Sequence, residues 1–150
     1  MKNDNSINVL NSLIVINNDR ISGYQTAIDE TDDQDLKIAF AQFVQTSSEC
    51  KNELVKAVNS LGGTPEDGTR IDGKIYRAWM DFKAMVTGKD RKAILNSCEY
   101  GEDVAVNSYE RAMKDPNLSS EHNSLISNQY AQIKEDHDTV KSMRDAEVDA

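Results

Sequence analysis

The sequence is poor in the residues that interrupt helices or cross-link chains. Its 150 residues include two prolines, seven glycines and two cysteines. Because proline and glycine break helices, their scarcity favours a few long helices over many short strands. Two cysteines are too few for a disulfide framework. Both Cys50 and Cys98 fall on apolar helical stripes, so we expect them to be buried free thiols.

Positive charge and long apolar runs are also scarce. Asp and Glu number 26 against 17 Lys and Arg, which gives a net charge of -9. Nucleic acids and anionic lipids are bound through Lys and Arg, so we expect neither as a partner. The apolar run at residues 13–16 is too short for a signal-peptide core or a membrane span. We therefore predict a cytoplasmic protein without a membrane segment.

Four segments carry apolar residues at steps of three and four, the spacing of a helix buried on one face. They predict helices at about residues 6–30, 33–61, 90–114 and 119–146. The second segment ends at Gly62 and Gly63, which are followed by Pro65, and Pro116 ends the third. Glycine accepts the left-handed conformation at a helix end, and proline cannot continue the helix.

The connection between the second and third predicted helices is long. It contains an amphipathic stretch that predicts a short helix at about residues 74–87, and we expect Trp79 to anchor it. A connection of this length can cross the bundle, so the helices on either side can run parallel. The predicted fold is all-α, a single domain at residues 1–150. It is a ferritin-like antiparallel four-helix bundle with a long crossover between the second and third long helices.

Polar residues on the inward stripes suggest a metal site. In ferritin-like di-iron bundles, two helices each supply a Glu and two others each supply Glu-x-x-His. Counting residues back from the two predicted turns places Glu49, Glu99 and His137 at similar heights along the bundle, with Glu53 one helical turn from Glu49. One hypothesis is therefore a reduced iron or manganese site made of Glu49, Glu53, Glu99 and His137.

The alternative, which we favour, is a buried polar network without a cofactor. Lys134 stands where the motif needs its first Glu, and Asn52 stands where it needs a His. A lysine removes an anionic ligand and supplies the charge that a metal would bring. We expect Lys134 to pair with Glu99 and His137 to form a hydrogen bond across the core. By the same count, Glu102 faces Tyr130.

Several short landmarks run in order along nearly the whole chain. They are residues 10–14, Asp19 with Gly23-Tyr24, Glu53-Leu54, residues 61–65, Arg77-Ala78-Trp79, residues 99–103 and His137-Asp138. With these landmarks the sequence resembles an uncharacterised bacterial family of four-helix-bundle proteins in the ferritin-like superfamily. Ser47 and Tyr76 depart from that pattern, where Arg and His are common. The resemblance implies the fold, but no activity, because the family has none established.

The sequence contains no phosphate-binding loop, Cys-x-x-Cys motif or zinc-finger spacing. We therefore predict a non-enzymatic cytoplasmic protein that acts by association with a protein partner or with itself, in a stress- or envelope-related setting. The alternative is a metal-binding redox protein. We also expect four apolar residues to be exposed and to widen one face enough for a homodimer: Val9, Leu13, Val106 and Met143.

Overall fold

The computed structural model describes residues 2–68 and 91–147, which form four helices. Their bounds are α1 Lys2–Glu30, α2 Gln34–Ser60, α4 Arg91–Met113 and α5 Ser120–Asp145. Helix α1 begins before the predicted residue 6, because no Gly or Pro stops it and Asp4 in its first turn interacts favourably with the helix dipole. The predicted short helix at residues 74–87, Trp79 included, lies outside the described residues.

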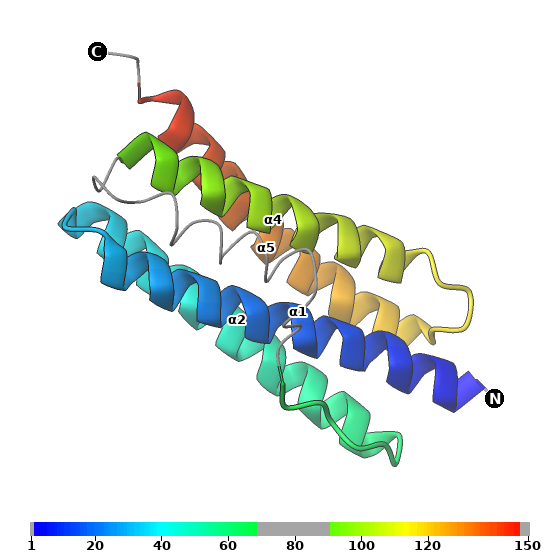
Figure 1. The fold of residues 1–150 in the computed structure, drawn as a ribbon. Coiled ribbons are helices and arrows are strands. Elements are labelled where there is room, and N and C mark those ends of the chain that lie inside the picture. Colours follow the sequence, from blue (N-terminus) through cyan, green and yellow to red (C-terminus); the bar gives the residue numbers. More distant parts are fainter. Residues whose placement is uncertain (1, 69–90, 148–150) are drawn as a thin grey trace.

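The four helices form an all-α bundle, as predicted (Figure 1). Helices α1 and α2 form one antiparallel hairpin, and α4 and α5 form the other. Helix α1 also packs against α4, and α2 against α5, so α1 and α5 occupy diagonal corners. In Figure 1, α2 and α4 run in the same direction. None of the described helices combines the length and hydropathy that a membrane span requires.

The end of α2 shows why the Gly62-Gly63 pair stops the helix. Gly62 has a φ of +81°, in the left-handed region that favours glycine. Its N–H donates to the carbonyl of Asn59, and the N–H of Gly63 donates to that of Val58, both at 3.0 Å. These two bonds form a Schellman motif. Gly63 also packs closely on α1, where a Cβ would lie 2.8 Å from Cγ2 of Ile7.

The apolar stripes of the four helices meet in one core. Tyr24, Phe40 and Phe43 pack together in its α1–α2 half with their rings tilted, and the ring centroids lie 5.1–6.3 Å apart. Cys50 and Cys98 are buried and free, as predicted. Burial raises the pKa of both thiols, to about 12 for Cys50 and well above the ordinary value for Cys98, so both stay protonated.

The expected apolar dimer face is only partly exposed. Leu13 is fully buried and Val106 is 7% exposed, so the prediction that they lie on the surface is wrong. The reason is that α1 packs directly on α4, which covers apolar positions beside the main stripe. Val9 and Met143 are half-buried against the same core. Within residues 2–68 and 91–147, the large apolar side chains that do face solvent are Ile38 on α2 and Tyr100 on α4.

Candidate functional site

A buried ion pair joins α1 to α4 at the centre of the bundle. The guanidinium of Arg20 donates to both carboxylate oxygens of Glu102, from Nε to Oε1 at 2.5 Å and from Nη2 to Oε2 at 3.0 Å. Both side chains are fully buried. Two parallel bonds between a guanidinium and a carboxylate fix orientation as well as charge. The pair therefore sets the position of α1 against α4.

The same guanidinium reaches the other two helices. It donates to the hydroxyl of Ser47 on α2 and to Oδ2 of Asp136 on α5, the latter at 3.3 Å. It also lies 5.6 Å from the ring centroid of Tyr24, within cation–π range. We call Arg20, Ser47, Glu102 and Asp136 the Arg20 layer, since each comes from a different helix.

The charges of the Arg20 layer do not balance, because one guanidinium faces two carboxylates. Burial alone lowers the pKa of Arg20, but the charge and hydrogen bonds of Glu102 more than offset this effect and raise it, so Arg20 stays charged. The pKa of Asp136 rises to about 6, because burial disfavours its carboxylate and Glu102 adds repulsion, while Arg20 opposes both. Near neutral pH the layer therefore carries a net negative charge.

A second polar chain also links all four helices. Asn17 on α1 donates to the hydroxyl of Tyr109 on α4 at 2.9 Å, and that hydroxyl donates to Oε1 of Gln129 on α5 at 2.7 Å. Gln129 then donates to Oε1 of Glu53 on α2 at 3.0 Å and to the carbonyl of Cys50 at 3.1 Å. Burial raises the pKa of Tyr109, which keeps the phenol protonated as this chain requires.

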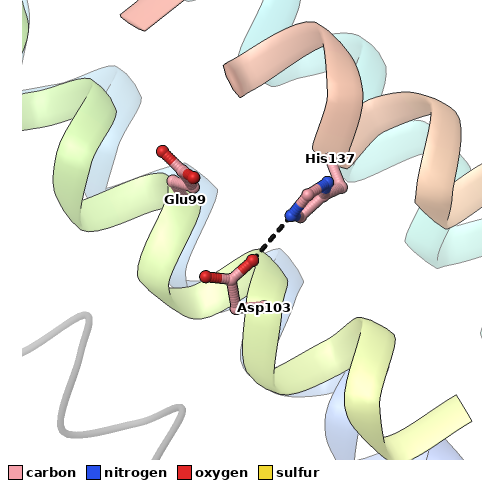
Figure 2. Close-up of side chains that lie close together, drawn as sticks. All are labelled: Glu99, Asp103 and His137. Atoms are coloured by element: carbon pink, nitrogen blue, oxygen red, sulfur yellow. Dashed lines mark hydrogen bonds and ion pairs between the residues drawn. The ribbon is translucent and has the colours of Figure 1, made fainter. Parts of the chain in front are cut away.

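Two of the four predicted metal ligands lie together. Figure 2 shows Asp103 on α4 joined to His137 on α5, with Glu99 on the neighbouring turn of α4. One ligand atom from each of the three lies within 4.8 Å of the others. Nε2 of His137 is 2.6 Å from Oδ1 of Asp103, and Nδ1 is 3.0 Å from Oδ1 of Asp138. Burial lowers the pKa of His137, but these two carboxylates outweigh it and raise the pKa overall.

The other two predicted ligands lie on α2 with different partners. Glu49 is exposed and accepts a hydrogen bond from Gln45 at 3.0 Å. Glu53 accepts a hydrogen bond from Gln129, at the end of the series of polar contacts that links the four helices. Among the described residues, neither belongs to a group that could share one metal ion with Glu99 and His137.

Two predicted pairings are wrong. Lys134 bonds Asp138 at 2.7 Å, while Glu99 pairs with Arg144. Tyr130 bonds Glu110 at 2.8 Å, while Glu102 pairs with Arg20. A count from the turn ignores that side chains lean toward the N-terminus of their own helix. In an antiparallel hairpin, this lean shifts contacts toward later residues of the second helix. The observed partners lie ten residues (Arg144 instead of Lys134) and eight residues (Glu110 instead of Glu102) from the counted ones, so the count also missed the register of α4 against α5.

Three residues of these clusters were not expected from the sequence: Arg20, Asp136 and Asp103. A signal for Arg20 was present, because it lies three residues after Asn17 and four before Tyr24, the spacing of one helix face. The next residue, Ile21, is apolar but only half-buried, so Arg20 and not Ile21 takes the inward position. An arginine on an inward face is uncommon, and it needs buried partners on other helices that a local pattern does not reveal.

Comparison with known proteins gives one family. Residues 5–115 match the model of a family described as a domain of unknown function (DUF2383). The matched segment contains most of α1 and all of α2 and α4, and therefore includes Arg20, Ser47, Glu102, Glu99 and Asp103. None of the curated proteins matches the chain. Since the family model covers well over half of the sequence, the chain belongs to the DUF2383 family.

Proposed function

We propose that this chain is a non-enzymatic, cytoplasmic helical-bundle protein that acts by association with other proteins, including copies of itself. The observation that carries the proposal is the position of Arg20. Its charged guanidinium lies at the centre of the bundle and contacts a residue from each of the three other helices.

Di-iron bundles use that central region differently. They direct carboxylates and histidines inward from all four helices, and the metal ions supply the balancing positive charge. Here α1 supplies an arginine, which stays charged and already binds the carboxylates of Glu102 and Asp136. The guanidinium already bonds both carboxylate oxygens of Glu102 and Oδ2 of Asp136, so few carboxylate oxygens remain free for metal ions. This arrangement supports a structural role for the core and disfavours di-iron redox chemistry inside it.

The surface supports association. Among the residues that the structure describes, two large apolar side chains face solvent, with Ile38 62% exposed and Tyr100 55% exposed. They lie on α2 and α4, which do not pack on each other. Tyrosine is enriched at protein interfaces. With a net charge of -9, two copies repel at low salt, so self-association should strengthen as salt screens the charge.

Sedimentation velocity over a range of protein and salt concentrations tests this proposal. We expect the mass to rise above the 16.8 kDa of one chain as concentration and salt increase. Ile38→Gln or Tyr100→Gln should reduce the association, and Ala131→Gln, an exposed position on α5, serves as the matched control. A mass of one chain under every condition would refute self-association. Turnover of ferrous iron or peroxide above a buffer control would refute the non-enzymatic role.

A further inference from the structure

The rim between α4 and α5 holds a group of side chains that the Arg20 layer does not use. Glu99 and Asp103 are one helical turn apart on α4, so both point to the same side, and His137 faces them from α5 (Figure 2). We propose that Glu99, Asp103 and His137 bind one divalent transition-metal ion at the surface of the bundle. This site is separate from the bundle centre, and it does not depend on the proposed association.

The geometry needs little change to hold an ion. The three ligand atoms already lie within 4.8 Å of one another. In a tetrahedral site, metal–ligand bonds of about 2.0–2.2 Å place neighbouring ligand atoms about 3.4 Å apart. Side-chain rotations alone can close that difference. Helices α4 and α5 pack directly on each other, so the backbone that carries the ligands is held in place.

His137 is already oriented as a ligand. Its Nδ1 lies 3.0 Å from Oδ1 of Asp138, while Nε2 points at Asp103. Metal-binding histidines commonly donate one ring N–H to a carboxylate, which fixes the tautomer and directs the other nitrogen at the metal. Lys134 in turn holds Asp138 through a 2.7 Å contact. In the proposed site the metal takes the place of a proton at Nε2.

The charges around the site favour a cation. Lys134 compensates Asp138, whereas Arg144 is shared between Glu99, through Oε2, and Asp145. The ion-pair partner of Asp103 within the described residues is His137 itself. With His137 neutral, as a ligand must be, the two cations Lys134 and Arg144 face four carboxylates, those of Glu99, Asp103, Asp138 and Asp145, which leaves two net negative charges around the metal. Arg144 competes for Glu99, so it should weaken metal binding.

The ligand types indicate the class of metal. Two carboxylates and one imidazole suit zinc and its first-row neighbours, whereas magnesium and calcium prefer oxygen ligands alone. Three protein ligands and a coordinated water would complete a tetrahedral zinc site. We therefore expect Zn²⁺ and Co²⁺ to bind, with Zn²⁺ tighter, and Mg²⁺ to bind much more weakly.

Titration of the metal-free full-length chain with Zn²⁺ by calorimetry tests the proposal, and the visible absorption of added Co²⁺ reports on its ligands. We expect one ion per chain. His137→Gln and Asp103→Asn should each weaken binding at least about tenfold, whereas Arg144→Gln should strengthen it. The matched controls are His122→Gln at the start of α5 and Glu49→Gln on α2, which should leave the affinity unchanged.

Three outcomes would overturn the proposed site: no saturable Zn²⁺ binding, unchanged affinity in His137→Gln, or equal losses in the His122→Gln control. Because Asp103 is exposed and His137 half-buried, these variants should fold, and circular dichroism checks that they do. The proposed association is read separately from the sedimentation mass of the metal-free protein, so the failure of one proposal does not affect the other.

Discussion

Replacing Arg20 with methionine removes the positive charge at the bundle centre and keeps most of the side-chain volume. The substitution leaves Glu102 fully buried and Asp136 largely buried without a counter-ion. Removing one partner of a buried ion pair typically costs about 3–5 kcal/mol. A domain of this kind has a total stability of about 5–15 kcal/mol, so we expect Arg20→Met to lose a large fraction of its free energy of unfolding.

Removing the carboxylate of the pair should reduce the free energy of unfolding by less than removing the guanidinium does. Glu102→Gln leaves the guanidinium of Arg20 charged, but Asp136 and the Ser47 hydroxyl still contact it. The double variant Arg20→Met/Glu102→Met removes both charges of the pair, and replacement of a buried pair by apolar residues is often near neutral. The double variant should therefore be more stable than Arg20→Met, with a coupling energy of about 2 kcal/mol or more.

Urea unfolding followed by far-UV circular dichroism measures these differences, provided that the slope of the transition stays constant among variants. Arg91→Met is the matched control, because Arg91 pairs with Asp33 and Asp35 at the surface, where Asp35 is 61% exposed. A surface pair contributes about 0–1 kcal/mol. A loss below about 1 kcal/mol in Arg20→Met, or a coupling energy near zero, would refute the reasoning.

Three further predictions follow from individual groups. The pKa of Asp136 is raised from 3.8 to about 6 in the folded state, so the folded protein binds this proton more tightly than the unfolded chain. As pH falls from about 7 to 4, the free energy of unfolding of wild type should therefore rise by up to about 3 kcal/mol relative to that of Asp136→Asn. Urea unfolding across that pH range measures the difference between the two proteins, and a difference that does not change with pH would contradict the prediction. Gly62→Ala should cost about 1 kcal/mol of unfolding free energy, because φ there is +81°; an unchanged urea midpoint would argue against the strain. Ser119→Ala should reduce the free energy of unfolding by about 1 kcal/mol and so lower the melting temperature, because the Ser119 hydroxyl accepts a hydrogen bond from the N–H of His122 at 3.1 Å. The control Ser142→Ala, near the end of α5, should leave the melting temperature unchanged.

Local pattern was enough to predict the helices. The steps of three and four between apolar residues, the Gly62-Gly63 stop and the break at Pro116 are properties of short segments. The described helices therefore fall close to the predicted ranges. The burial of Cys50 and Cys98 was predictable for the same reason, because burial follows from position on a stripe.

The pairing of polar side chains was decided by the tertiary structure. Arg20, Ser47, Glu102 and Asp136 come from four helices, and no local pattern links them. Of the predicted ligands, Glu99 and His137 meet across α4 and α5. Asp103 lies with them, which could not be predicted without the register of the two helices. That register depends on how side chains lean and how helices pack.

The sequence by itself determined that this chain forms long amphipathic helices, because hydrophobic periodicity acts within each segment. The tertiary structure decided which charges became buried and which partners they found. A buried arginine is stable only where carboxylates from other helices converge on it, and such convergence is a property of the packed bundle, not of any one helix.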